Sequence, residues 1–149
     1  MPNYYLAMYI GEGDWKDKLV RKVTRSKYSH CEIKASHSGL GITSSLRNGG
    51  VRMKYIEFEK NWELIPIHFY VPDNIADKAR PHKGKRYDII NMFFTKFFKY
   101  PYPFEDSNRY TCSEFCGYLL GIQQPYDYSP EQLMNKVIEL NESTPEKYN

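Results

Sequence analysis

The segment Tyr110–Cys116 places a cysteine where a helix is expected to begin. Thr111 can cap this helix with its hydroxyl, and Glu114, three residues later, can reach back to the N–H of the cap, which is a capping box. Cys112 would then be the first helical residue. The unpaired N–H groups and the positive end of the helix dipole stabilise a thiolate there, and the thiolate is the form of cysteine that attacks carbonyl carbon. The spacing therefore favours thiol chemistry at Cys112.

A cysteine nucleophile needs a base within hydrogen-bond reach, and histidine is the residue used most often. The chain contains four histidines. His30 stands at the head of a predicted strand, a rigid position from which a side chain can be aimed. His37 lies in a predicted turn and His82 in a loop with Pro and Gly, while His68 falls inside an apolar segment and is expected to pack. His30 is the best candidate base.

Two other interpretations of these residues stay open. Cys112 could belong to the apolar stripe of a buried helix, because free cysteine is among the most buried residue types. Cys112 and Cys116, one helical turn apart, could also bind zinc together with His30 and Cys31. Adjacent residues on a strand point to opposite faces, however, so His30 and Cys31 cannot easily share one ion. We therefore expect no metal or organic cofactor and interpret Cys31 and Cys116 as packing residues.

The composition indicates one domain spanning residues 1–149, because 41% hydrophobic residues can fill a single core. The net charge of +3 is mild, and the basic residues gather in two clusters, at 16–27 and 78–86. Such runs are usually solvated faces, although an anionic surface or ligand would also suit them. Nucleic acid is not an expected partner.

The three cysteines are too few for a disulfide framework, and their odd number leaves a thiol free in any pairing scheme. The N-terminal residues lack the basic region and apolar run of a secretory signal, and no stretch approaches the roughly 20 apolar residues that span a bilayer. The sequence thus predicts a cytoplasmic protein.

Strand and helix patterns alternate along the chain. The short turns between the strands predict an antiparallel meander, and helical signals dominate the second half. Predicted strands cover 4–10, 29–35, 40–46, 51–58 and 62–71, and predicted helices cover 14–26, 74–79, 87–98, 112–120 and 130–140. Residues 141–149 are predicted to be a loose C-terminal tail.

Several motifs in their order resemble one enzyme family. The segment Leu19–His30 contains a Thr-x-Ser-x-Tyr-Ser-His pattern, and Tyr110–Phe115 contains Cys-Ser-Glu at the start of a helix. Asn48–Arg52 has a Gly-Val turn, and Gly84–Asp88 reads Gly-x-x-Tyr-Asp. Together they resemble the circularly permuted NlpC-type papain-like hydrolases, a group that includes the YiiX-like and YebB-like proteins and, more distantly, lecithin retinol acyltransferase.

The resemblance implies a role for five residues. Cys112 would be the nucleophile and His30 the general base, with Tyr87 supplying a hydroxyl near the thiol. The third polar residue of the family falls at Ser44, which can orient an imidazole but lacks the charge that stabilises an imidazolium. Glu32 shares a strand and a face with His30 and is the obvious substitute.

The resemblance also implies a fold and an activity. The fold would be α+β and permuted papain-like, with an antiparallel sheet of about five strands packed against helices and the Cys112 helix abutting the sheet. The activity would be cleavage of an amide in a peptide, isopeptide or peptidoglycan through an acyl-enzyme on Cys112.

Two alternatives to this activity remain. The first is a lipid thioesterase or acyltransferase acting on acyl lipids at a membrane surface, to which the aromatic segment 93–100 would contribute. The second is a catalytically weak papain-like fold used as a protein-binding module. The sequence does not indicate an oligomeric state.

Overall fold

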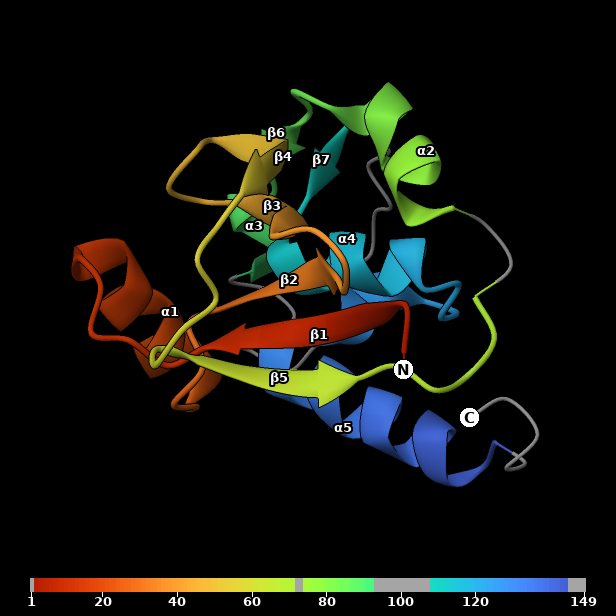
Figure 1. Ribbon diagram of the computed structural model, residues 1–149. Helices are drawn as coiled ribbons and strands as arrows, with labels where there is room; N and C mark the ends of the chain where they lie inside the picture. The colour runs from red at the N-terminus through yellow and green to blue at the C-terminus, as the bar shows by residue number, and fades with distance from the viewer. Residues whose placement is uncertain (1, 72–73, 93–107, 145–149) are drawn as a thin grey trace.

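The computed structural model describes residues 2–71, 74–92 and 108–144. These residues form a mixed α+β arrangement with one sheet in the order β5-β1-β2-β3-β4-β6-β7 (Figure 1). The strands are β1 (Tyr4–Tyr9), β2 (His30–Ala35), β3 (Leu40–Ser45), β4 (Gly50–Tyr55), β5 (Trp62–Pro66), β6 (Arg86–Tyr87) and β7 (Arg109–Tyr110). The helices are α1 (Trp15–Thr24), α2 (Ile75–Ala79), α3 (Ile89–Asn91), α4 (Cys112–Leu119) and α5 (Pro130–Glu142).

The five strands expected from the sequence are present as β1 to β5, but the sheet has seven strands rather than about five. The other two, β6 and β7, contain two residues each, too few for an alternating pattern to be recognised in the sequence. β6 pairs antiparallel with β4, and β7 pairs parallel with β6, so the sheet is mixed rather than antiparallel. β5 also returns to pair with β1 instead of extending the meander beyond β4.

The side chains of β2 alternate between the two faces of the sheet. Cys31 and Ile33 are fully buried in the hydrophobic core, whereas His30 and Glu32 point to the opposite face because side chains on a strand alternate. β1 lies on one side of β2, with Tyr9 opposite His30, and β3 lies on the other. A candidate base and a carboxylate thus share one face in the centre of the sheet.

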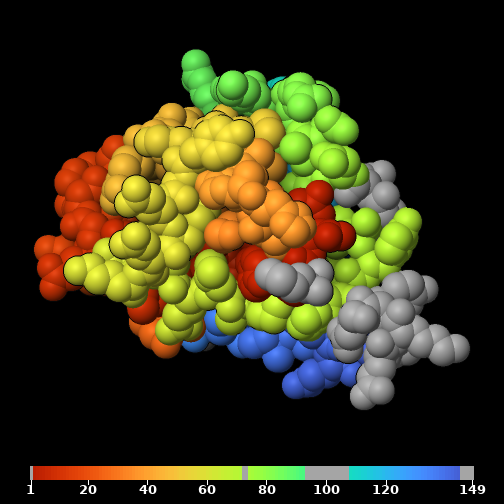
Figure 2. All heavy atoms as spheres, in the orientation of Figure 1, coloured from red at the N-terminus to blue at the C-terminus, as the bar shows by residue number. Residues whose placement is uncertain are grey.

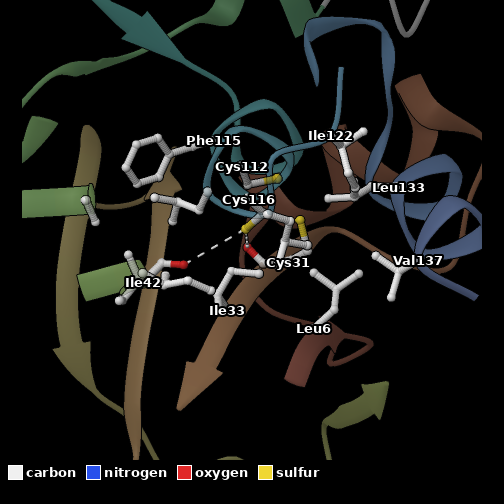
Figure 3. Packing of buried hydrophobic residues seen from close by; sticks show 14 of the residues in the cluster. Leu6, Cys31, Ile33, Ile42, Cys112, Phe115, Cys116, Ile122, Leu133 and Val137 are labelled. Carbon is white, nitrogen blue, oxygen red and sulfur yellow. Dashed lines mark hydrogen bonds between the residues drawn. The ribbon is translucent and has the colours of Figure 1, made fainter. Parts of the chain in front are cut away.

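The hydrophobic core lies between the sheet and the helices α4 and α5 (Figures 1 and 3). α4 packs against β2 and β3, and α5 packs against β1 and β5. Phe115 and Leu119 of α4 and Leu133 and Val137 of α5 are fully buried. Full burial of side chains of this size contributes about 1.5–3 kcal/mol each. This packing holds the helix that begins at Cys112 against the strand that carries His30.

The end of α5 is anchored, which corrects the expected loose tail from residue 141. The helix continues to Glu142. The side chain of Asn141 accepts a hydrogen bond from the N–H of His68 (2.9 Å) and donates one to the carbonyl of Pro66 (2.7 Å). The polar composition of this end gives no sign of contacts with residues more than 70 positions away. Residues 145–149 lie outside the described residues.

Other expectations fall partly or wholly outside the described ranges. The predicted helix at 87–98 is represented only by α3, because Tyr87 belongs to β6. Residues 93–98 of this prediction, like the whole aromatic segment 93–100, lie outside the described ranges. Within the described ranges, none of the helices combines the length and apolar character needed to cross a membrane.

Candidate active site

The start of α4 has the capping box that the sequence predicts. The Thr111 hydroxyl accepts a hydrogen bond from the N–H of Glu114 (3.1 Å), and the Glu114 carboxylate accepts one from the N–H of Thr111 (3.3 Å). The amide of Asn91 also donates to Glu114 (3.1 Å), which ties α3 to this end of α4. Cys112 is the first residue of the helix. Its sulfur therefore lies at the positive end of the helix dipole.

The cap gives a testable expectation for stability. Replacing Thr111 with Ala leaves the N–H of Glu114 without its acceptor, and the loss of such a cap costs about 1 kcal/mol. We expect the urea midpoint of Thr111→Ala to fall accordingly. Thr111→Ser is the matched control because it keeps the hydroxyl. Equal midpoints for the Ala and Ser variants would show that the cap contributes nothing.

His30 lies between a thiol and a carboxylate. Its Nε2 is 3.0 Å from Oε1 of Glu32, and its side chain is 15% exposed. Burial alone would lower the pKa of His30, but hydrogen-bonding and charge interactions with Cys112 and Glu32 raise it from 6.5 to about 10. The imidazole is therefore protonated at neutral pH.

Cys112 is correspondingly ionised. A hydrogen bond from the Cys31 thiol and the interaction with the His30 imidazolium hold the pKa of Cys112 well below 9.0, against the effect of burial. The side chains of Cys31, Cys112 and Cys116 gather at the interface between α4 and the sheet (Figure 3). Both shifts favour a Cys112 thiolate beside a His30 imidazolium, the form in which a cysteine is a ready nucleophile.

Glu32 is the carboxylate that holds the imidazolium. It is completely buried, and besides His30 it accepts two hydrogen bonds from the guanidinium of Arg52. Burial would raise the pKa of Glu32, but His30 and Arg52 together bring it below 4.5. Gly41 of β3 leaves room for this group, because a Cβ there would stand 2.2 Å from Oε2 of Glu32.

Ser44 does not orient the imidazole, which corrects the expectation drawn from the resemblance. Its hydroxyl donates a 2.6 Å hydrogen bond to the carbonyl of Tyr110. The alternation of side chains along β3 explains this. Ser44 shares a face with the core residue Ile42, and this face lies on the side of the sheet away from Glu32. Ser44 instead fixes the chain directly before α4, and the position beside His30 is filled by Glu32.

Tyr87 is buried and interacts electrostatically with Cys112. Burial and the neighbouring Cys112 thiolate raise the pKa of Tyr87 well above 10. Its hydroxyl has a weak acceptor in the sulfur of Met92, 3.8 Å away. The phenol is therefore neutral and able to donate a hydrogen bond at any physiological pH.

The other two cysteines differ in their roles. Cys116 packs in the core, with its sulfur 3.7 Å from the carbonyl of Cys31 and 3.9 Å from that of Ile42 (Figure 3). Cys31 is also fully buried, but its thiol lies against Cys112, which makes it more than a packing residue. For the zinc alternative, no group of three or more His, Cys, Asp or Glu among the described residues is arranged to hold a metal ion.

A cavity of about 300 Å³ opens on the face of the sheet that carries His30 and Glu32. Both side chains line it, as do Arg52 and Tyr87. Cys112 is not among the lining residues and is only 2% exposed. A substrate in the cavity would therefore meet the imidazolium and the phenol that flank the thiol.

Sequence reasoning missed Arg52 and the contribution of Cys31. Arg52 lies opposite Thr43 in the pairing of β3 with β4, and this register brings it next to Glu32. Arg52 can be recognised as a partner of Glu32 only once the register between β3 and β4 is known. Cys31 carried no signal, because a buried thiol that packs and one that donates to a thiolate have the same sequence pattern.

Comparison of the sequence with models of known protein families and with curated proteins found no match.

Proposed function

We propose that this chain is a cysteine-dependent hydrolase that cleaves an amide through an acyl-enzyme on Cys112. The observation that carries the proposal is the set of interactions at His30, whose imidazole interacts with the Cys112 thiol and with the buried carboxylate of Glu32. A nucleophile, a base and a group that orients the base are the three parts that acyl transfer by a thiol requires.

In the acylation step, the Cys112 thiolate attacks the carbonyl carbon and the carbonyl π electrons move to oxygen. The N–H of Cys112 and the hydroxyl of Tyr87 would donate hydrogen bonds to this oxyanion. His30 then gives its proton to the leaving amine as the C–N bond breaks, which leaves an acyl thioester on Cys112. Nε2 is held by Glu32, so Nδ1 is the ring nitrogen that would carry this proton.

In the second step, His30 is neutral and takes a proton from water while the water oxygen attacks the thioester. The acid leaves, and the thiolate and imidazolium form again. Glu32 stays ionised in both steps, because the Arg52 guanidinium lowers its pKa whether His30 is charged or neutral. Its role is to hold the ring in one tautomer and orientation.

The order of the parts along the chain supports a permuted papain-like fold as part of the proposal. The strand with the base, β2, precedes the helix with the nucleophile, α4, and the two pack directly together. The choice of an amide as substrate comes from the family resemblance. The same family also includes enzymes that act on lipid esters.

Trapping the acyl-enzyme tests the proposal. After brief incubation with excess 4-nitrophenyl acetate and an acid quench, peptide mass spectrometry is expected to find one acetyl group, on Cys112. Cys112→Ser is the control for the nucleophile, and Cys31 and Cys116 are internal controls because both are fully buried. A folded protein that acquires no acetyl group on Cys112 would contradict hydrolase chemistry and favour a binding role for the fold.

A parallel incubation with N-acylated peptides separates amide from ester cleavage. We expect release of a new amino terminus from some of the peptides by the wild-type chain and none by Cys112→Ser. Turnover of acyl esters of lipids alone, with every peptide intact, would move the assignment to the lipid class.

A further inference from the structure

The cavity beside His30 is lined by four cationic side chains. Lys16 comes from α1, Arg47 from the turn after β3, and Arg52 and Lys54 from β4. Among the described residues, two carboxylates, Asp17 and Glu32, line the same cavity. In Figure 2 the yellow residues that follow β4 lie next to red residues from the N-terminal part of the chain. The positive side chains thus come from two separate segments of the chain, α1 and the β3–β4 hairpin.

Both carboxylates already have partners. Asp17 accepts hydrogen bonds from the Arg47 guanidinium, from the Ser29 hydroxyl (3.2 Å) and from the N–H of Asp14 (3.0 Å). Glu32 is held by His30 and Arg52. The two acids thus neutralise the two arginines of the cavity, and neither is available to a lysine.

The lysines lack such partners. Among the residues that the structure describes, neither Lys16 nor Lys54 forms an ion pair or a side-chain hydrogen bond, and the ammonium of Lys16 lies 5.8 Å from the centre of the Trp15 ring. The thiolate of Cys112 is balanced by the imidazolium of His30. Two positive charges therefore remain uncompensated at the cavity.

Another part of the wall is apolar. Tyr9, Ile56 and Trp62 line the cavity, and the rings of Tyr9 and Trp62 pack with their centres 5.0 Å apart. Trp62 also lies 6.2 Å from the ring of His30. An apolar group could pack here while a charged group reaches the lysines.

We propose that the substrate carries an oxyanion, a carboxylate or a phosphate, that Lys16 and Lys54 bind, and that its acyl portion packs against Tyr9 and Trp62. The inference rests on the proposed thiol chemistry at Cys112 and specifies the substrate class of that site. An ammonium group is a compact point charge suited to either oxyanion, and an excess of positive charge at a cavity raises the local concentration of anions by about 10-fold or more.

Competing alkylation of Cys112 tests the inference without any hydrolysis. Iodoacetate is an anion and iodoacetamide its neutral analogue, so the ratio of their rates at Cys112 reports the field at the cavity. We expect this ratio to fall about 10-fold in the Lys16→Gln/Lys54→Gln variant, and the wild-type ratio to fall as salt is added. His30 is present in both proteins, so its own attraction for iodoacetate cancels in the comparison.

Lys60→Gln is the matched control, because Lys60 is exposed and does not line the cavity. Thermal unfolding of each variant checks the fold. An unchanged ratio in a folded double variant whose Cys112 still reacts with iodoacetamide overturns the inference and leaves the hydrolase proposal intact. Failure of both reagents to label Cys112 in the wild-type chain overturns both.

Protection of Cys112 against iodoacetamide then identifies the oxyanion. Glutarate and butyl phosphate are added in parallel, and we expect at least one to slow labelling in the wild-type chain and neither to do so in the double variant. Protection by glutarate alone assigns a carboxylate, and protection by butyl phosphate alone assigns a phosphate. Absence of protection by both at saturating concentrations counts against the inference.

Discussion

Replacing His30 with Ala is expected to lower the rate at which iodoacetamide alkylates Cys112 at pH 6 by about 10- to 100-fold. In the wild-type chain the imidazolium helps to keep the thiol ionised at this pH. Without it, the Cys112 pKa rises toward the ordinary cysteine value of about 8.5, and less than about 1% of the thiol is ionised at pH 6. The loss in rate is smaller than the loss of thiolate, because a thiolate of higher pKa is intrinsically more nucleophilic.

The pH profile distinguishes this effect from a general disturbance of the site. The wild-type rate should change little between pH 6 and 9, whereas the rate of His30→Ala should rise about tenfold per pH unit until the thiol ionises. His37→Ala is the control, because His37 is exposed in the turn between β2 and β3. A flat profile for a folded His30→Ala variant would mean that the thiolate does not depend on the imidazolium.

Replacing Glu32 with Ala is expected to lower the free energy of unfolding by about 3–5 kcal/mol. The carboxylate is completely buried, and its removal leaves the guanidinium of Arg52 and the imidazolium of His30 without their shared counter-charge. Removing one partner of a buried ion pair lowers the free energy of unfolding by about this amount. Urea denaturation at pH 7 measures it. Glu139→Ala is the matched control, because Glu139 is exposed and its ion pair with Lys136 is a surface pair.

Glu32 also predicts how stability depends on pH. Its pKa is lower in the folded chain than the ordinary 4.5, so the stabilisation is fully present above pH 4.5. It is lost as the pH falls from 4.5 through the lowered folded-state value. The acid side of the stability curve should therefore be flatter in Glu32→Gln than in the wild-type chain. If the free energy of unfolding falls equally steeply with decreasing pH in both proteins, the pKa of Glu32 does not differ between the folded and unfolded chain.

A third variant distinguishes the loss of the ion pair from the loss of the volume that its side chains fill. Replacing Glu32 and Arg52 together with apolar residues of similar size should recover part of the stability lost by Glu32→Ala, because the guanidinium is no longer buried without its counter-charge. The same double variant should still lower the alkylation rate at pH 6, since the carboxylate that holds His30 is gone. Recovery of stability without recovery of reactivity would identify Glu32 as a positioning residue for His30.

Much of the candidate site was predictable because its parts are local. The capping box of Thr111 and Glu114 involves residues three positions apart, so the sequence alone placed Cys112 at the first turn of a helix. The head of β2 was likewise set by a short run of residues, which identified His30. The five longer strands had enough residues to reveal their alternation, whereas β6 and β7 did not.

The partners of these residues were decided by the tertiary structure. Ser44 and Glu32 were both candidates for holding His30, and only the phase of β3 and its register with the neighbouring strands turned Ser44 toward Tyr110. The same registers brought Arg52 to Glu32 and left room at Gly41 for the carboxylate. The packing of α4 on the sheet set the Cys31 thiol against Cys112. A sequence fixes which residue begins a helix through contacts within one turn, but which groups meet across a sheet depends on register and packing between distant segments.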